Sequence, residues 1–315
     1  MFRRLVFIAA LGCLAALAQQ RIPIIFDTDI GDDIDDALAL ALALQSPELD
    51  VRAVTTVIDD VDLRTRLAWK QLGLYGRRDI PLGTGASEPL LDPMINNKSR
   101  QYDVLTDADT FPPAARKHAA QLIIETLMRS SEKITVVPVG PLTNIALALK
   151  TEPKIKDKIE RIVLMGGSFY PPRREYNIYR DRIAAEVVFR SGVPIVAVGL
   201  DVTTKCKLQG SDMERMRAAK NPASQFLVRL IELWQNGKPD QYPTLHDPLA
   251  VASTVRPGLI ETQTGEVHVE TASPLTFGTT VFKQGPGKTQ AARDVNVRGF
   301  LDLFVERLSA SPRGK

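Results

Sequence analysis

The sequence predicts a single α/β domain with a central, mostly parallel sheet flanked by helices. Short β-branched apolar runs alternate with helical patterns through the first two thirds of the chain, which is the rhythm of strand–helix–strand units. The runs are almost continuously apolar, as in parallel strands that are buried on both faces. No Ser/Gly/Pro-rich linker long enough to separate two domains interrupts the 315 residues.

The alternating part is expected to supply strands and helices in turn. The expected strands are residues 22–26, 51–57, 134–139, 162–165 and 195–198, and the expected helices are residues 35–45, 62–75, 114–130, 142–150 and 181–190. Residues 37–44 alternate Ala and Leu with period two, as a strand would. We still predict a helix there, because Ala and Leu have high helix propensity and weak strand preference.

The rhythm changes after about residue 205. The expected helices in this part are residues 224–236, 249–253 and 299–308, and the expected shorter strands are residues 267–271 and 279–283. Two Pro-containing stretches, residues 88–113 and 167–174, are expected to be surface loops. Long loops near strand ends often carry function.

The first 18 residues have the features of a secretory signal peptide. Arg3 and Arg4 precede an apolar run that ends in the cleavage motif Ala16-Leu17-Ala18. The run is too short for a comfortable membrane span. We expect cleavage after residue 18, a mature domain at residues 19–315 with no stable membrane span, and a secreted or periplasmic location. An uncleaved anchor and a lipoprotein site at Cys13 are the alternatives.

The charge balance does not favour a nucleic acid or a membrane surface as partner. The chain has 40 Lys+Arg and 37 Asp+Glu, and loss of the two signal-peptide arginines leaves 38 against 37, or +1. No long run of like charges is present. The mature chain keeps one cysteine, Cys206, so it can form no internal disulfide and its stability must come from its core.

Six aspartates follow the first expected strand within ten residues. They are Asp27, Asp29, Asp32, Asp33, Asp35 and Asp36. Acids are favoured at a helix N-terminus, but that explains one or two of them, not six. Carboxylates packed this densely repel one another unless a cation lies among them, and a hard divalent cation such as Ca²⁺ or Mg²⁺ takes oxygen ligands. The cluster lies where a strand leads into a helix, which is where open α/β sheets place their sites.

Several weaker motifs follow along the chain. Residues 138–149 form a strand, a glycine turn at Gly140 and a helix, and a glycine there lets a ligand approach the backbone. A second strand ends in a double glycine and is followed by Glu175 and Asn177, a carboxylate and an amide that suit polyol hydroxyls. His246 and Asp247 open a helix-like run, and His246 is a candidate for acid–base work.

In this order the motifs resemble those of the inosine–uridine preferring nucleoside hydrolase family. The motifs that carry the resemblance are, in order, DTDxGxxxDDA, GPLTNIA, MGG, ExN and HDP. The resemblance extends over residues 24–308. It implies a Ca²⁺-dependent enzyme with a mostly parallel sheet that hydrolyses the N-glycosidic bond of ribonucleosides to free base and ribose. It also implies a small nucleoside as substrate, and a homodimer or homotetramer as the expected assembly.

The resemblance assigns a metal site to four residues. Asp29 and Asp36 match two calcium ligands of the first motif, and Asp29 is also the expected general base for the attacking water. Val139 matches the position that gives a backbone carbonyl to the metal. Asp247 matches a distant aspartate ligand.

The remaining matches concern the substrate. Asp35 matches a residue that contacts ribose hydroxyls, and Glu175 and Asn177 match the ribose-binding pair. His246 matches the histidine proposed to protonate the leaving base. Asp60 falls where the family often has the Asn of a Gly-Asn pair, and it could still hydrogen-bond sugar. Cleavage of this bond needs a positioned water, a sugar clamp and help for the leaving base, which these residue types can supply.

The chain departs from the family pattern around the substrate. The first motif is two residues longer than usual, so Asp32 or Asp33 could take one of the assigned roles. The His-Gly pair often seen near the base is missing from residues 88–113, and no Asn lies between Ser168 and Arg174. The metal residues are therefore matched, whereas the substrate rim is altered and leaves the base preference open.

Two other hypotheses explain part of the pattern. A haloacid-dehalogenase-like phosphotransferase also begins with DxD after a strand and uses Mg²⁺, with Asp27 as the nucleophile, but it does not explain the DDA and HDP motifs. A secreted relative could instead bind Ca²⁺ and a sugar or nucleoside without turnover. Retention of Asp29 and His246 disfavours that second hypothesis. Metal-dependent release of free base would distinguish a hydrolase from a binding protein without turnover.

Overall fold

The computed structural model describes residues 21–92 and 99–313, so the expected signal peptide at residues 1–18 lies outside the described residues. The strands are β1 (Ile22–Thr28), β2 (Leu49–Thr56), β3 (Leu82–Thr84), β4 (Ile134–Pro138), β5 (Ile159–Met165), β6 (Ile195–Val198), β7 (Ile260–Val269), β8 (Thr280–Gln284) and β9 (Thr289–Val295). The α-helices are α1 (Asp35–Gln45), α2 (Val61–Leu74), α3 (Ala119–Arg129), α4 (Thr143–Thr151), α5 (Tyr176–Arg180), α6 (Arg182–Phe189), α7 (Leu200–Thr203), α8 (Gly210–Ala218), α9 (Pro222–Gln235), α10 (His246–Val255) and α11 (Val297–Ser309). The 3₁₀ helices are η1 (Arg100–Val104), η2 (Asp107–Asp109), η3 (Pro113–Ala115), η4 (Pro153–Lys158) and η5 (Pro257–Leu259). Within these described elements, no helix is long and apolar enough to cross a membrane.

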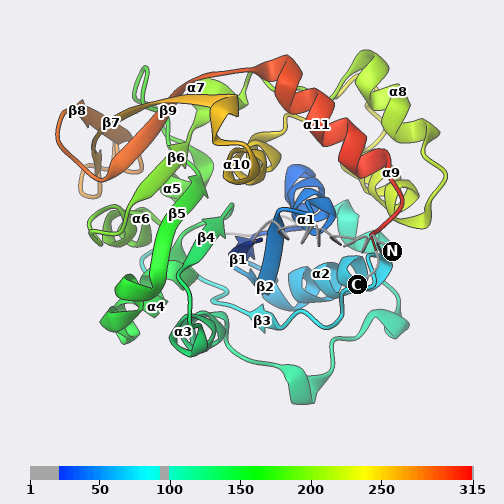
Figure 1. The fold of residues 1–315 in the computed structure, drawn as a ribbon, viewed down its shortest axis with the longest axis horizontal. Coiled ribbons are helices and arrows are strands. Elements are labelled where there is room, and N and C mark those ends of the chain that lie inside the picture. Colours follow the sequence, from blue (N-terminus) through cyan, green and yellow to red (C-terminus); the bar gives the residue numbers. More distant parts are fainter. Residues whose placement is uncertain (1–20, 93–98, 314–315) are drawn as a thin grey trace, which may run out of the picture.

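The described strands form one sheet in the order β3-β2-β1-β4-β5-β6-β9-β7-β8 (Figure 1). Neighbours from β3 to β9 pair in parallel, whereas β7 pairs antiparallel with both β9 and β8. The predicted fold class, a mostly parallel sheet flanked by helices in one domain, is therefore confirmed.

Two hydrophobic cores lie on the two faces of this sheet. Successive side chains of a strand point to opposite faces, so Ile24 and Phe26 of β1 belong to one core and Ile25 to the other. The first core packs against α1, α2, α9, α10 and α11, and the second against α3, α4 and α6. Figure 1 shows α3, α4 and α6 on one side of the central strands and α1, α10 and α11 on the other. Burial on both faces explains why these strands are almost continuously apolar.

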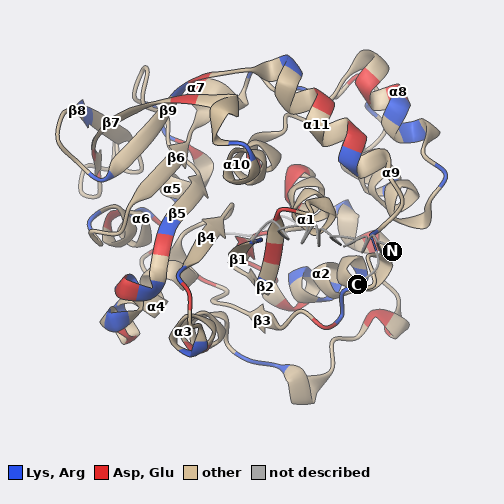
Figure 2. Ribbon diagram, in the orientation of Figure 1, with Lys and Arg blue, Asp and Glu red and all other residues tan. Residues whose placement is uncertain are grey.

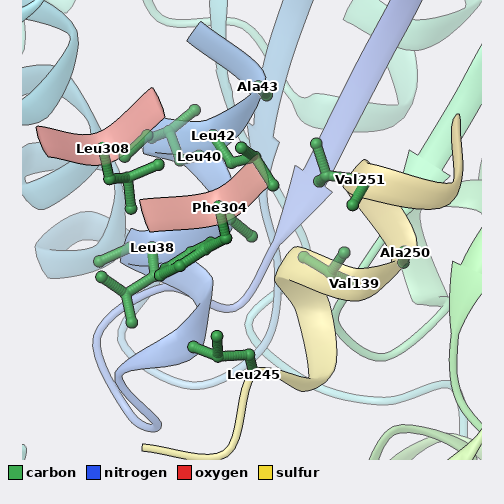
Figure 3. Packing of buried hydrophobic residues seen from close by; sticks show 14 of the residues in the cluster. Leu38, Leu40, Leu42, Ala43, Val139, Leu245, Ala250, Val251, Phe304 and Leu308 are labelled. Atoms are coloured by element: carbon green, nitrogen blue, oxygen red, sulfur yellow. The ribbon is translucent and has the colours of Figure 1, made fainter. Parts of the chain in front are cut away.

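Helix α1 is buried along its whole length. Figure 3 shows Leu38, Leu40 and Leu42 of α1 beside Phe304 and Leu308 of α11. An α-helix covered on all sides needs no amphipathic stripe, so an alternating Ala/Leu sequence can fill every face of it. The predicted helix over residues 35–45 is confirmed with the same bounds.

The structure differs from the expected elements in several places. Helix α3 begins at Ala119 rather than at residue 114, because residues 113–115 form a separate 3₁₀ turn. Strand β7 begins at residue 260, seven residues earlier than expected. The sequence did not predict β3, β9, α5, α7 or α8. Strand β3 has only three residues, and β9 contains Asp and Ala, which are depleted in strands.

The sheet changes direction of growth at β1. Its neighbours β2 and β4 lie on opposite sides of it, so β1 and β4 border a topological switch point. Ligands of open α/β sheets bind outside the carboxyl ends of the strands at such a point. The aspartate-rich segment follows β1 there, and the glycine turn at Gly140 follows β4.

Candidate active site

A cavity of about 450 Å³ lies at the carboxyl ends of β1, β4 and β5. All the predicted site residues except Asp60 line it: Asp29, Asp35, Asp36, Val139, Glu175, Asn177, His246 and Asp247. In Figure 2 acidic residues colour the beginning of α1, which forms one wall of the cavity. The fold therefore brings together residues that are up to 218 positions apart, from 29 to 247.

Three buried carboxylates form the tightest acidic cluster among the described residues. Asp35, Asp36 and Asp247 each offer one oxygen, and these oxygens lie within 4.8 Å of one another. The Thr28 hydroxyl donates to Oδ1 of Asp36 (2.5 Å), and the backbone N–H of Asp247 donates to Oδ2 of Asp35 (3.0 Å). These two bonds fix the start of α1 against β1 and against α10.

Asp29 lies beside this cluster, and a glycine makes room for it. A Cβ atom added at Gly140 would be 2.6 Å from Oδ1 of Asp29, so a side chain at position 140 would collide with the carboxylate. Burial raises the pKa of Asp29 to about 6, while the nearby charge of Arg64 acts in the opposite direction. Val139, the neighbour of Gly140, lines the same cavity.

The electrostatics of the cluster call for a cation. Burial raises the pKa of Asp35, Asp36 and Asp247 well above the usual range, and the charges of neighbouring aspartates raise it further. At neutral pH such groups either hold a proton or bind a positive charge. The donor atoms are all oxygens, the ligand type that hard divalent cations prefer. The residues present therefore fit a divalent metal ion.

The predicted sugar-binding pair lines the same cavity, at the start of α5. Glu175 is buried and accepts hydrogen bonds from the backbone N–H groups of Gly167 (3.0 Å), Asn177 (2.8 Å) and Ile178 (3.1 Å). Burial nevertheless raises the pKa of Glu175 to about 7. The Asn177 amide nitrogen donates to the carbonyl oxygen of Val139 (2.6 Å), which ties the start of α5 to the end of β4.

His246 is the first residue of α10 and is only partly accessible. Its Nδ1 lies 2.7 Å from the Thr203 hydroxyl oxygen. Burial lowers the pKa of His246 to about 4, so the imidazole is uncharged at neutral pH. An uncharged imidazole carries one N–H and one lone pair. If the Thr203 hydroxyl donates to Nδ1, the hydrogen is on Nε2; if Nδ1–H donates to the hydroxyl, Nε2 has the lone pair.

The two extra aspartates line the mouth of the cavity. Asp32 is half-buried and Asp33 is exposed, in contrast to the buried aspartates that follow them. Gln101, which is completely buried, donates to both backbone carbonyls (2.9 Å each) and so anchors the longer loop. Gly31 has φ +113°, and a Cβ there would lie 2.5 Å from the Tyr102 ring, so only glycine fits.

Asp60 is the one predicted site residue outside the cavity lining. Its side chain is exposed and caps α2, with Oδ1 accepting from the backbone N–H of Leu63 (3.0 Å). Its neighbour Asp59 instead turns its carboxylate inward, where it is 5 % exposed. The sugar contact assigned to Asp60 stays a prediction.

Further residues line the cavity that the sequence did not predict as site residues: Met165, Arg174, Tyr176, Leu200 and Trp234. Met165 is the first residue of the MGG motif and Tyr176 the middle residue of the ExN motif. Arg174 and Tyr176 flank Glu175, so proximity to the ExN motif is a signal that could have found them. Trp234 lies near the end of α9, where its helical pattern looks like ordinary core. No local signal marks Trp234, because only tertiary packing brings α9 to the cavity.

Asp27, the first aspartate of the segment, lies beneath the cavity and is completely buried. One of its oxygens accepts hydrogen bonds from the Thr55 hydroxyl (2.5 Å) and from the Asn144 amide nitrogen (2.8 Å). Asn144 also donates to the carbonyl of Thr56, so this aspartate joins β1, β2 and α4. Its place is that of a structural residue rather than of an accessible nucleophile.

Residues 24–302 match the model of the family described as inosine-uridine preferring nucleoside hydrolase. The chain belongs to this family. The predicted resemblance is thereby confirmed, and the phosphotransferase hypothesis with Asp27 as nucleophile is wrong. Membership makes the chain an N-glycosyl hydrolase of the nucleoside-cleaving class.

Relatives and solved structures agree with this assignment. The chain is 39% identical over 309 residues to the pyrimidine-specific ribonucleoside hydrolase RihA of Citrobacter koseri, with 91% of this chain and 98% of the relative covered. It is 38% identical to the enzyme of the same name from Photobacterium profundum, with the same shares covered. The purine-preferring ribonucleoside hydrolase from Gardnerella vaginalis has a TM-score of 0.80 at 30% identity, covering 91% of this chain and 98% of that one. The plant nucleoside hydrolase PpNRh1 has a TM-score of 0.80 at 28% identity, covering 92% and 99%.

Proposed function

We propose that this chain is a calcium-dependent hydrolase that cleaves ribonucleosides to free base and ribose. One observation carries the proposal. A single cavity combines a buried carboxylate cluster, Asp35, Asp36 and Asp247, with the carboxylate of Glu175 and the amide of Asn177. The first group suits a hard cation and the second suits the hydroxyls of an uncharged sugar.

Four residues would hold the calcium ion. These are Asp29, Asp36 and Asp247 through their carboxylates and Val139 through its backbone carbonyl. Asp35 belongs to the cluster with Asp36 and Asp247, and its proposed role is to contact the ribose hydroxyls. When bound, the ion would supply positive charge that orients a water molecule and the ribose hydroxyls. Oxygen-only donors favour calcium or magnesium over zinc.

The protein side chains divide the remaining work. Asp29, whose pKa is raised by burial, accepts a proton from the attacking water. Asp35, Glu175 and Asn177 accept hydrogen bonds from the sugar hydroxyls or donate to them, which holds the ribose as positive charge develops on it. His246 would give the departing base a hydrogen bond from Nε2–H in the tautomer in which the Thr203 hydroxyl donates to Nδ1.

The names of the relatives and the apolar lining of the cavity bear on which base is preferred. The relatives at 38–39% identity carry the name pyrimidine-specific, whereas a structural neighbour at 30% identity carries the name purine-preferring. The names of the sequence relatives favour pyrimidine ribonucleosides as the first substrates to test. Met165, Leu200 and Trp234 supply the apolar part of the cavity against which a base could pack.

We further propose that residues 1–18 are a signal peptide and that the mature chain is exported to the periplasm or secreted. The basic start, the short apolar run and the Ala16-Leu17-Ala18 motif support this. N-terminal sequencing of protein from an envelope fraction tests it. An intact Met1 or a lipidated Cys13 would contradict it. Homodimer or homotetramer formation stays a prediction from the resemblance.

A turnover screen tests the main proposal. Uridine, cytidine, inosine, adenosine and guanosine are incubated with the purified protein in calcium, in magnesium and after treatment with a chelator. We expect release of free base and reducing sugar that disappears with the chelator and returns with calcium. Full activity in metal-free protein would contradict the metal assignment. Calcium-dependent nucleoside binding without release of base would favour the binding-protein hypothesis instead.

A further inference from the structure

The turn between β2 and α2 has an unusual backbone. Ile58 and Asp59 both have left-handed conformations, with φ +62° and +63°. Left-handed φ is unfavourable for residues with a Cβ, and most of all for a β-branched one such as Ile58. The surrounding structure enforces it, because the N–H groups of Ile58 and Asp59 donate to the carbonyls of Ala86 (2.6 Å) and Ser87 (2.7 Å). Such strain often marks a functional position.

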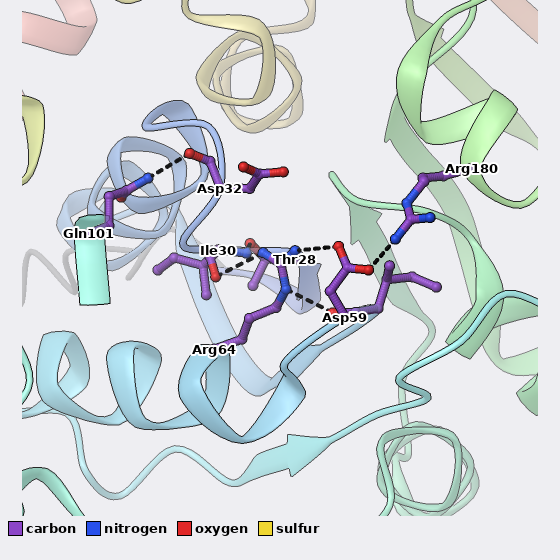
Figure 4. A network of polar contacts seen from close by, with 8 residues as sticks. Thr28, Ile30, Asp32, Asp59, Arg64, Gln101 and Arg180 are labelled. Atoms are coloured by element: carbon purple, nitrogen blue, oxygen red, sulfur yellow. Dashed lines mark hydrogen bonds and ion pairs between the residues drawn. The ribbon is translucent and has the colours of Figure 1, made fainter. Parts of the chain in front are cut away.

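This backbone directs the Asp59 carboxylate inward between two arginines (Figure 4). Oδ2 lies 3.3 Å from Nη2 of Arg64, and Oδ1 pairs with Nη2 of Arg180. All three side chains are buried, with exposed fractions of 5 % for Asp59, 1 % for Arg64 and 3 % for Arg180. Exposed ion pairs contribute little, whereas breaking a buried pair leaves an uncompensated charge.

Arg64 connects Asp59 to the metal side of the cavity. Its Nη1 donates to the carbonyl of Ile30 (3.1 Å), the residue directly after Asp29. Its Nε donates to the carbonyl of Ile58 (2.8 Å), so every part of the guanidinium has a partner. Arg64 therefore fixes the backbone of the aspartate loop relative to the β2–α2 turn.

Arg180 connects Asp59 to the sugar side of the cavity. It is the last residue of α5, the one-turn helix that begins directly after Glu175 and contains Asn177. Its Nε and Nη1 are buried and have no hydrogen-bond partner among the described residues. The carboxylate of Asp59 is thus the acid that compensates this buried cation, and without it Arg180 would have to move.

We propose that Asp59 is a positioning residue of the sugar site. By bridging Arg64 and Arg180 it holds the loop that carries Asp29 at a fixed distance from the helix that carries Asn177. Hydrolysis needs Asp29 and Asn177 in place at the same time, because Asp29 must accept a proton from the water while Asn177 and Glu175 hold the ribose. Misplacement of about 1 Å between such groups can reduce the rate by about 10²-fold. The inference rests on the proposed function of the cavity.

The test compares ribonucleosides with their 2′-deoxy counterparts. Asp59→Gly suits the left-handed backbone, and Asp59→Asn keeps the shape but removes the charge. Both are expected to lower kcat/KM about tenfold on uridine, or on inosine if wild type prefers purines. The loss on the 2′-deoxynucleoside is expected to be smaller, because it lacks a hydroxyl that the clamp holds. The ratio of kcat/KM on the ribonucleoside to kcat/KM on the 2′-deoxynucleoside is therefore expected to fall. A merely structural role would lower the two kcat/KM values by the same factor and leave their ratio unchanged.

Arg180 variants examine the same bridge from its other end. Arg180→Met should reproduce the change in the ratio, and Arg180→Lys, which keeps the charge, should restore most of it. The double variant Asp59→Asn with Arg180→Met should lose no more than Asp59→Asn alone, because both changes remove the pair between Asp59 and Arg180. Additive losses, or an unchanged ratio in folded Asp59→Gly protein, would overturn the inference.

Asp212→Asn is the matched control. The Asp212 side chain is also buried, at 9 % exposed, and forms a two-bond ion pair (2.9 and 3.0 Å) with Arg298, whose side chain is 56 % exposed. Asp212 lies outside the cavity lining. We expect this variant to lower thermal stability and to leave the ribo-to-deoxy ratio unchanged. An equal fall of the ratio in the control would show that general destabilisation is responsible and would contradict the proposed role.

A binding measurement separates this inference from the proposed function. Calorimetric titration with D-ribose and 2-deoxy-D-ribose in calcium reads the sugar site without turnover. We expect weaker ribose binding in Asp59→Gly and little change with 2-deoxyribose. Wild-type protein that binds ribose but cleaves no nucleoside would refute the proposed function while still testing Asp59. Wild-type protein that does neither would refute both.

Discussion

The floor and the rim of the cavity are built in different ways. The floor, Asp29, Asp35, Asp36 and Asp247, consists of buried side chains at strand ends and helix starts, and Asp29 is only 5 % exposed. The rim, Asp32, Asp33, Arg174, Tyr176 and Trp234, comes mainly from loops and helix ends, and Tyr176 is 47 % exposed. A buried carboxylate is costly and is retained only where it has a partner or a ligand. The contrast indicates that the chemistry belongs to the floor, whereas the choice of substrate belongs to the rim.

Asp29→Asn is the change with the largest expected effect, and it acts on the floor alone. An amide cannot take a proton from water and is a poorer ligand for a hard cation. Loss of general-base catalysis should lower kcat by about 10²–10⁴-fold while the fold is kept. Steady-state kinetics on uridine and inosine, with circular dichroism as the folding control, measure it.

The rim supplies the rival bases for this experiment. Asp32→Asn and Asp33→Asn should change kcat by less than about tenfold, because Asp32 is half-buried and Asp33 is exposed, whereas Asp29 is buried. If Asp29→Asn kept activity within tenfold of wild type and one of these two lost it, the longer loop would have taken over the role of base.

His246→Ala tests whether His246 assists the departure of the base. The wild-type imidazole is uncharged at neutral pH, so its help to the base is a hydrogen bond from a ring N–H. Acid catalysis matters most for bases that leave poorly. We expect about a 10²-fold loss on nucleosides and little loss on an activated nitrophenyl riboside. Equal losses on both substrates would show that His246 only orients Asp247.

The pH dependence of stability distinguishes the metal-free floor from the loaded one. Folding raises the pKa of Asp27 and Glu175 to about 7 and of Asp29 to about 6, so the folded state binds more protons than the unfolded state between about pH 4 and 7. Metal-free protein should therefore lose stability as the pH rises through this window. His246, with its pKa lowered to about 4, acts in the opposite direction and favours stability as the pH rises. It is one group against the three carboxyl groups, so the net loss of stability with rising pH is still expected.

Thermal unfolding in chelator at pH 5, 6, 7 and 8 measures this trend, and the same series in calcium is the comparison. Calcium should stabilise the protein more at pH 8 than at pH 5, because metal and protons compete for the same carboxylates. A melting temperature of metal-free protein that rises steadily from pH 5 to pH 8 would contradict the raised pKa values of Asp27, Asp29 and Glu175.

Most of the floor could be predicted from the sequence, and the reason is local. Asp29, Asp35 and Asp36 are close in sequence, directly after an apolar strand, where so many acids have no structural explanation. Asp247 is different, because it meets Asp35 across 212 residues and only the resemblance indicated it. The parallel strands were also predictable, since burial on both faces gives continuous apolar runs.

The rim and its supports could not be predicted in the same way. Trp234 reaches the cavity only because α9 packs beside the aspartate loop, and its own helical pattern does not show this. The pairing of Asp59 with Arg64 and Arg180 depends on a left-handed turn that sequence patterns do not specify. Tertiary packing decides these contacts, so local periodicity contains no signal for them.

Asp60 gives the smallest expected effect and decides whether the rim extends to the start of α2. The sequence assigned it a sugar contact, whereas its observed hydrogen bond is the cap to Leu63. If capping is its role, Asp60→Ala should lower the free energy of unfolding by about 1 kcal/mol, and Asp60→Asn, a comparable cap, should not. KM for ribonucleosides should stay unchanged in both. Denaturant unfolding and steady-state kinetics measure the two quantities. A KM raised in Asp60→Ala but not in Asp60→Asn would restore the sugar contact, because Asn is the residue that the family often has at this position.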